Sequence, residues 1–191
     1  MTYVSVITLV TYALVLGLLA VVSVIDIRSR RVPNGLAAAL GFLWVAWRVV
    51  LGFAGAHMGL GFRAEFLGPA PDVLVPPGLE IGGISFASGL LGAVVLGGGL
   101  LVLTTLYELI RRKEAFGGGD IKLLFLTGLF LGWKRNLLCL VAACVIGIVW
   151  GLLQKKRGGG EAIPWGPSIA LGAWLTALCG QQIIHWYLGL L

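Results

Sequence analysis

Two aspartates stand at the edges of long apolar segments. Asp26 ends the first apolar run, and Asp120 follows three consecutive glycines at the start of a later one. Hydrocarbon cannot solvate a carboxylate, so an acid in such a place is a candidate functional residue. Two carboxyl groups that share one water can hydrolyse a peptide bond, because one takes a proton from the water while the other gives a proton to the carbonyl oxygen. Like charges in close contact divide these roles, and the sequence leaves open which aspartate is the acid.

The residues around Asp120 suit the binding of an extended peptide. An extended substrate strand needs hydrogen-bond partners where water is scarce, and the bare backbone of the three glycines before Asp120 could supply them. Lys122 follows two residues after Asp120 and could tune its charge or bind lipid phosphate. The alternative interpretation is that each aspartate pairs with a nearby Arg or Lys at a helix end.

The composition is that of an integral membrane protein. Hydrophobic residues make up 59% of the 191 residues and charged residues 12%, against about 25% charged residues in soluble domains. The mean hydropathy is +1.00. The net charge of +6 is explained by basic loops that fix membrane topology, so we expect membrane lipid and not nucleic acid as a partner.

Six apolar segments predict an all-α bundle of six transmembrane helices, in a single transmembrane domain over residues 1–191. A span needs about 20 residues, and the fourth segment is short for one. The predicted segments are Val4–Ile25, Leu36–Ala56, Ile81–Leu106, Ile121–Trp133, Leu137–Leu153 and Ser168–Leu190.

Between the second and third segments, His57–Glu80 is rich in Pro and Gly, which argues against a regular helix there. We expect a loop outside the membrane. Lys134 and Arg135 are expected to break the chain between the fourth and fifth segments.

Basic residues decide the predicted orientation. Ten of the fourteen fall on one side of this topology, which marks the cytoplasm and places both termini outside. The ten are Arg28, Arg30, Arg31, Arg111, Arg112, Lys113, Lys122, Lys155, Lys156 and Arg157. Asp26 and Asp120 then lie at the same membrane depth, so topology permits them to meet.

The sequence predicts neither a metal site nor a disulfide framework. The cysteines, Cys139, Cys144 and Cys179, lie inside apolar runs and form no CxxC pair, so they are expected to be small packing residues. No nucleotide-binding, zinc-protease or serine-hydrolase motif is present. A small transporter or channel is the non-enzymatic alternative, and it predicts acids that line a path across the bilayer.

Three motifs resemble those of a known family, the type IV prepilin peptidases. Residues 26–34 resemble its first-aspartate motif, an aspartate followed by an Ile/Val-Pro-Asn/Asp turn. Residues 116–123 resemble its GxGD motif with the trailing Lys-Leu, and residues 163–172 are similar to its late Pro-x-Gly-Pro block. The three motifs occur in order within a six-span chain.

This resemblance implies a membrane aspartyl endopeptidase that needs no cofactor. Its substrates would be type IV prepilins or pseudopilins, cut after a short basic leader at the cytoplasmic face of the inner membrane. Asp26 and Asp120 match the catalytic pair, and Gly117 and Gly119 match the family glycines beside the second aspartate. The oligomeric state does not follow from the motifs.

Many family members carry an additional N-terminal region with paired CxxC motifs, associated with N-methylation. This sequence has no such cysteines, so we expect the short, peptidase-only form, without N-methyltransferase activity or use of S-adenosylmethionine. The predicted cytoplasmic rim is basic, like the leaders. We therefore expect the acids predicted on that side, Glu108, Glu114 and Glu161, to receive the leader.

A presenilin-like intramembrane protease is the second enzymatic alternative, since it shares the GxGD signature. The Val32-Pro33-Asn34 turn after Asp26 favours the prepilin peptidase resemblance.

Overall fold

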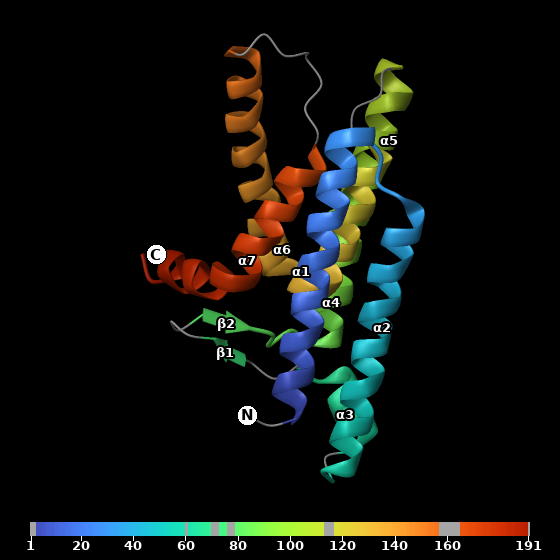
Figure 1. Ribbon diagram of the computed structural model, residues 1–191, viewed down its shortest axis with the longest axis vertical. Coiled ribbons are helices and arrows are strands. Elements are labelled where there is room, and N and C mark those ends of the chain that lie inside the picture. The colour runs from blue at the N-terminus through green and yellow to red at the C-terminus, as the bar shows by residue number, and fades with distance from the viewer. Residues whose placement is uncertain are drawn as a thin grey trace.

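The protein is an elongated bundle of helices (Figure 1). A computed structural model describes residues 3–59, 61–69, 73–75, 79–112, 117–156 and 165–190. The elements in chain order are α1 (Tyr3–Ser29), α2 (Asn34–His57), α3 (Phe62–Leu67), β1 (Val73–Val75), β2 (Leu79–Ile81), α4 (Phe86–Gly92), the π-helix η1 (Ala93–Gly98), α5 (Gly99–Arg111), α6 (Gly118–Lys156) and α7 (Trp165–Leu188).

The longest element, α6, is two helical arms joined by a reversal at Gly132. Gly132 has φ +70° and ψ 173°, which is not helical. Asn136 Nδ2 donates to the carbonyl oxygen of Leu124 at 3.0 Å. Twelve residues along a straight helix would separate these groups by about 18 Å, so the second arm folds back along the first. Both ends of α6 therefore lie toward the same end of the bundle (Figure 1).

The prediction of six helices is confirmed when the two arms of α6 are counted separately. Four helical stretches in the described part of the chain are long and apolar enough to cross a membrane: α1, α2, Phe86–Arg111 and α6. The predicted break at Lys134 and Arg135 is wrong by a few residues, because the reversal occurs at Gly132 and the second arm already contains both basic residues. Glycine adopts the left-handed conformation that this reversal requires.

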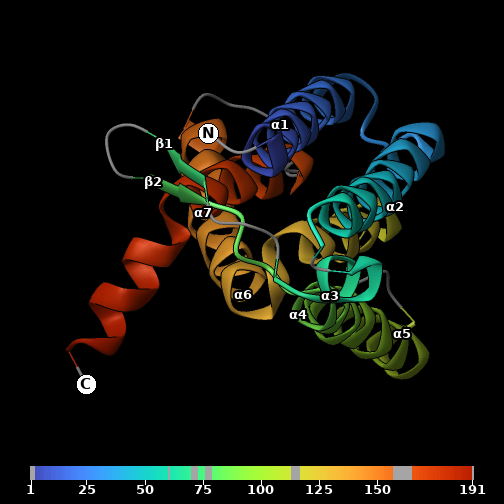
Figure 2. The same ribbon diagram turned by 90° about the horizontal axis from the view of Figure 1, so that it is seen from below.

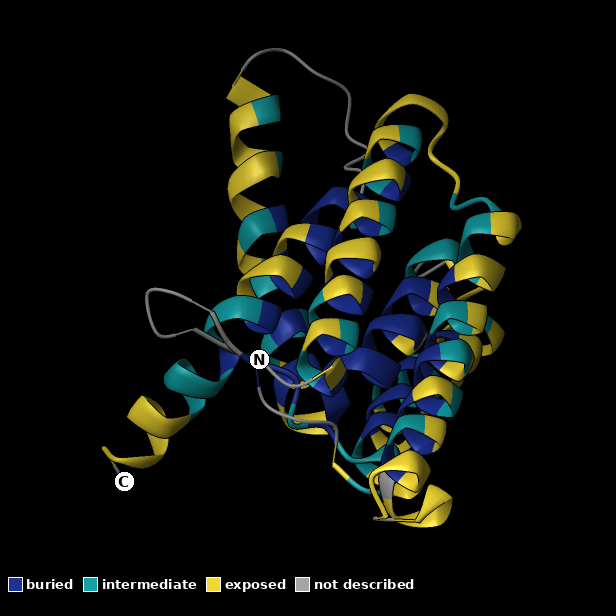
Figure 3. Ribbon diagram, turned by 60° about the horizontal axis from the view of Figure 1, so that its bottom comes forward, coloured by how far each residue is buried: buried dark blue, intermediate teal, exposed yellow. Residues whose placement is uncertain are grey.

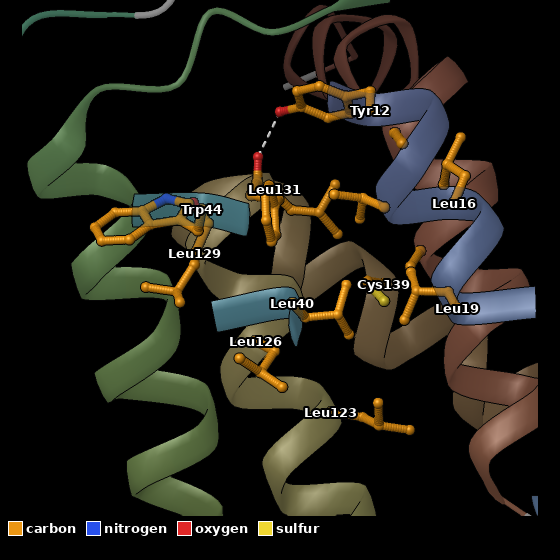
Figure 4. Packing of buried hydrophobic residues seen from close by; sticks show 14 of the residues in the cluster. Tyr12, Leu16, Leu19, Leu40, Trp44, Leu123, Leu126, Leu129, Leu131 and Cys139 are labelled. Atoms are coloured by element: carbon orange, nitrogen blue, oxygen red, sulfur yellow. Dashed lines mark hydrogen bonds between the residues drawn. The ribbon is translucent and has the colours of Figure 1, made fainter. Parts of the chain in front are cut away.

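The reversal frees backbone carbonyls that two aromatic side chains satisfy. The last carbonyls of a helix have no partner within it. The hydroxyl of Tyr12 donates to Phe130 O at 2.6 Å, and Trp44 Nε1 donates to Leu129 O at 3.0 Å. Figure 4 shows Tyr12 and Trp44 approaching this turn from α1 and α2, beside the buried leucines of the core. The end of the first arm is thus fixed between the two N-terminal helices.

The third predicted span is one continuous helical stretch made of α4, η1 and α5. It begins at Phe86 and not at the predicted Ile81, because Ile81 belongs to β2 and Ser85 caps the helix by accepting from Ser88 N–H at 3.1 Å. Its glycines allow close packing on α6: a Cβ atom built at Gly92 would lie 2.6 Å from the carbonyl carbon of Gly132. Seen from below, α6 lies between α7 and α4 (Figure 2).

The segment predicted to be an irregular loop, His57–Glu80, contains regular structure. Helix α3 forms over six residues that hold neither Pro nor Gly, between Gly61 and Gly68. Its rings of Phe62 and Phe66 stack with centroids 5.6 Å apart. Strands β1 and β2 pair antiparallel, with Val73 opposite Ile81.

Large apolar side chains cover the outside of the bundle. Helix α5 has a single buried residue, Thr104, while Leu109 and Ile110 are 72% and 77% exposed. Figure 3 shows buried residues along the inward faces of the helices and exposed ones along the outward faces. Apolar outward faces of this extent suit contact with lipid, and the chain is a multi-pass membrane protein.

Candidate active site

The carboxyl group of Asp26 lies in the last turn of α1 and is held by the start of α7. Arg30 ends the helix with φ +51°, and its N–H donates to Asp26 O at 2.8 Å. The Asp26 side chain is 6% exposed. Its Oδ2 accepts the backbone N–H of Gly166 at 3.0 Å. Because the N-terminus of a helix carries partial positive charge, the first turn of α7 stabilises negative charge on Asp26.

Glycine is required where α7 meets Asp26. A Cβ atom built at Gly166 would lie 2.6 Å from Asp26 Oδ2 and 2.9 Å from its Cγ. The backbone of any other residue could not approach the carboxylate so closely without a shift. Pro167 follows in the same first turn, where its missing N–H costs no helical hydrogen bond.

Asp120 lies in the first turn of α6, and the glycines before it allow two close contacts. A Cβ atom at Gly117 would lie 2.8 Å from Asp120 Oδ2, and one at Gly119 would lie 2.9 Å from Val32 Cγ2. Gly118 faces open space. Gly117 thus makes room for the Asp120 carboxyl group, and Gly119 for the segment between α1 and α2.

The two aspartates, remote in sequence, line one cavity of about 320 Å³. They are near enough for the charge of Asp26 to act on Asp120. The remaining lining residues come from the end of α1, the segment that follows it and the start of α6; they are Arg30, Arg31, Val32, Gly117, Gly118, Gly119 and Lys122. The space admits water and a short stretch of peptide beside both carboxyl groups.

The predicted alternative, in which each aspartate pairs with a basic residue, finds no support in the described residues. Lys122 Nζ donates to Asn34 Oδ1 at 2.9 Å. Within the described part of the chain, the side chain of Asp26 has one hydrogen-bond partner, the backbone N–H of Gly166. Lys122 and Asn34 together tie the start of α6 to the start of α2 beside the cavity.

Of the three acids expected to receive a basic leader, the structure describes only Glu108. Glu108 lies half-buried on α5 and is absent from the described lining of the cavity. Glu114 and Glu161 lie outside the described residues. Among the described residues that line the cavity, the charged side chains other than the two aspartates are basic: Arg30, Arg31 and Lys122.

Sequence reasoning missed Gly166 as a site residue. The signal was available, because Gly166 is the glycine of the Pro164-Trp165-Gly166-Pro167 block. Its partner could not be read from that block, since the hydrogen bond joins residues 140 positions apart. Among the described residues, no group of three or more His, Cys, Asp and Glu side chains could hold a metal ion.

Comparisons with known proteins place these features in a family. The sequence profile of the type IV leader peptidase family matches residues 13–152. A prepilin leader peptidase/N-methyltransferase of Aeromonas salmonicida is 34% identical over 189 residues, covering 93% of this chain and 61% of the relative. The protein of the same name from Pseudomonas aeruginosa is 36% identical over 174 residues, covering 80% of this chain and 59% of the relative.

This chain therefore spans about three fifths of the length of these curated relatives. No solved structure matches it. The matched region contains both aspartates and the glycine triplet, whereas the third motif, residues 163–172, lies beyond it. The chain belongs to the type IV leader peptidase family.

Proposed function

We propose that this chain is a membrane aspartyl endopeptidase that removes the leader of a type IV prepilin or pseudopilin. The observation that carries the proposal is the convergence of Asp26 and Asp120 on one cavity from the ends of two different helices. Family membership supports the substrate class. The transporter alternative is disfavoured because these two acids share one cavity and do not lie at successive depths.

The proposed chemistry uses both carboxyl groups and one water. The ionised aspartate takes a proton from the water as its oxygen attacks the scissile carbonyl carbon, and the protonated aspartate gives its proton to the carbonyl oxygen. The resulting tetrahedral diol collapses as a proton passes to the amide nitrogen and the C–N bond breaks. The products are a leader with a new carboxyl end and a pilin with a new amino end.

We assign the ionised role to Asp26. The N–H of Gly166 and the N-terminus of α7 hold negative charge there, whereas no described N–H outside its own helix donates to the side chain of Asp120. Asp120 then begins as the acid, beside the glycines that leave its carboxyl group accessible from the cavity.

An apolar groove supplies a place for the substrate next to the scissile bond. This space of about 480 Å³ shares Gly118 and Lys122 with the catalytic cavity. Leu101, Phe125 and Leu126 give it an apolar wall. We propose that it receives the apolar segment of the substrate on one side of the cut, while the catalytic cavity holds the scissile peptide.

We also propose that the active site faces the cytoplasm of the inner membrane. Basic residues gather at the end of the bundle where α1 ends, α2 begins and both ends of α6 lie (Figure 1). The described ones are Arg28, Arg30, Arg31, Arg111, Arg112, Lys122, Lys155 and Lys156. An excess of Lys and Arg marks the cytoplasmic side, and both termini would then lie outside.

Co-expression with a candidate prepilin tests the proposal, with leader removal followed by gel shift. Asp26→Asn and Asp120→Asn should each abolish processing while the protein still inserts in the membrane. Arg28→Gln is the matched control, because Arg28 is an exposed neighbour of Asp26 that is absent from the cavity lining, and it should process normally. Full processing by either Asn variant would overturn the assignment.

A further inference from the structure

A second cavity lies at the reversal of α6, remote from the aspartates. Its volume is about 340 Å³. It is lined by the residues that lead into α4, by the turn between the arms of α6 and by one residue of α7: Gly83, Ile84, Ser85, Ser88, Leu131, Trp133, Lys134, Arg135 and Gln181. Nothing in the proposed proteolysis uses this cavity.

Arg135 brings a buried positive charge to the cavity wall. Its side chain is 4% exposed. Nη1 donates to Gly82 O at 2.8 Å, and Nη2 and Nε donate to Gln181 Oε1 at 3.1 and 3.4 Å. All these acceptors are neutral, and among the residues whose side chains the structure describes, a group that excludes Glu80, no carboxylate pairs with Arg135. A guanidinium has five N–H donors, so two remain for a further partner.

Arg48 is a second buried guanidinium in the same fold, and it differs from Arg135 in its surroundings. Arg48 is fully buried and donates to the carbonyl oxygens of Gly68 and Ile84. Its guanidinium also lies 4.8 Å from the centroid of the Trp47 ring, which contributes a cation–π interaction. No such aromatic face covers Arg135 among the described contacts. The open side of Arg135 is the cavity.

Further donors border the same space. Lys134 adds a second positive charge on an exposed side chain, near the ring of Trp133. Ser85 Oγ accepts from Ser88 N–H, so its hydroxyl proton is available to a ligand. Two cations and two hydroxyl groups around one cavity have the chemistry of an oxyanion site.

We propose that this cavity binds a phosphate group, with the Arg135 guanidinium as a two-pronged donor and Lys134 as the second cation. Arg pairs with phosphate through parallel N–H···O bonds, and an anion at this point removes the cost of a buried, uncompensated charge. The phosphate could belong to a phospholipid head group, because such a group presents the same oxygens to Arg and Lys as free phosphate does. It could also be free inorganic phosphate.

The turn of α6 explains why a counter-ion matters here. The first arm, Gly118–Leu131, is about 21 Å long at 1.5 Å per residue, which is less than the roughly 30 Å of bilayer hydrocarbon. An arm of this length that starts at one face of the hydrocarbon ends inside it, and Lys134 and Arg135 follow its end directly. Charges at such a depth need water, an internal partner or a bound ion.

The test uses the purified chain in uncharged detergent, with thermal unfolding and Trp fluorescence as readouts. The probes are inorganic phosphate, dihexanoyl phosphatidylglycerol and dihexanoyl glycerol, each at constant ionic strength. Binding of both phosphate probes assigns the phosphate group. Binding of the phospholipid alone, without binding of inorganic phosphate, assigns a lipid head group. Dihexanoyl glycerol is the control for binding through the acyl chains, because it has the same chains and no phosphate.

Lys134→Gln should raise the dissociation constant of the phosphate probe about tenfold, as expected for loss of one charge-assisted hydrogen bond. Arg135→Lys should keep the positive charge but lose the two parallel N–H donors of the guanidinium. The dissociation constant should therefore rise more than in Lys134→Gln. Lys156→Gln removes an exposed lysine at the opposite end of the bundle and should bind like the unmodified chain.

Two results would overturn the proposal. One is a negative binding result: neither phosphate probe changes the unfolding midpoint or the Trp fluorescence, or Lys134→Gln and Lys156→Gln bind the probe equally well. The other concerns Glu80, which precedes Gly82 by two positions. A phosphate response that arises only in Glu80→Gln would show that an internal carboxylate neutralises Arg135. Neither readout depends on proteolysis, so failure here leaves the proposed peptidase function untouched.

Discussion

The backbone N–H of Gly166 and the Oδ2 atom of Asp26 lie 3.0 Å apart, across 140 positions of sequence. This contact joins the start of α7 to the last turn of α1. It fixes the carboxylate at a helix N-terminus, and it uses a glycine because no side chain fits between the two helices.

Gly166→Ala should disable the site while leaving the bundle intact. The new Cβ atom would lie 2.6 Å from Asp26 Oδ2, so the carboxylate must move and lose its N–H donor. We expect processing of a prepilin to fall at least about tenfold, the effect of one misplaced catalytic group. Gly35→Ala is the matched control, because a Cβ atom at Gly35 meets nothing within 4 Å. Equal processing by both variants would contradict the role of Gly166.

Gly119 and Val32 should behave as a coupled pair. Gly119→Ala would bring a Cβ atom 2.9 Å from Val32 Cγ2 and push apart the two segments that border the aspartates. We expect a several-fold loss of processing, and recovery of part of it when Val32→Ala is added, because the second change removes the methyl group at 2.9 Å and leaves the Cβ atom at 3.1 Å. Additive losses in a double-mutant cycle would show that the contact is not the cause.

Filling the apolar groove should affect substrate binding more than chemistry. Gly98→Leu places an apolar side chain in the groove, and the first atom of that side chain meets only Val94 Cγ1 at 3.9 Å. We expect the KM for a substrate with an apolar segment to rise several-fold with little change in kcat. Gly99→Leu, at a glycine that faces open space and is absent from the groove lining, should leave both constants near their original values. A fall in kcat with constant KM would contradict the groove assignment.

Gly132→Ala should destabilise the protein through the reversal of α6. Gly132 has φ +70° and ψ 173°, a backbone region that only glycine adopts readily and that costs other residues about 1–3 kcal/mol. A Cβ atom there would also lie 2.7 Å from Ser88 Oγ. We expect a lower midpoint of thermal unfolding in detergent. Gly17→Ala, in an open position of α1, should leave the midpoint unchanged or raise it slightly, since Ala favours helix. A midpoint for Gly132→Ala equal to that of the unmodified chain would exclude strain at the reversal.

Local patterns were enough to predict the helices and the two aspartates. The length of an apolar run reports whether a helix can cross a bilayer, and the distribution of Lys and Arg reports which ends lie together. Both properties can be read from the order of residues along the chain, without knowledge of how the helices pack. The pattern therefore predicted six helices and placed Asp26 and Asp120 toward one end of the bundle, where the structure has them line a single cavity.

The folded arrangement alone decided which residues complete each site. Gly166 supports Asp26, Gly119 accommodates Val32 and Gly132 reverses α6. Each of these roles is set by the atoms of a neighbour that is distant in sequence. A glycine triplet indicates that another part of the chain packs closely against it, but only the tertiary structure shows which residue makes the contact. The position of Arg135 is also set by the tertiary structure. It is buried beside a cavity whose walls come from segments that are distant in sequence.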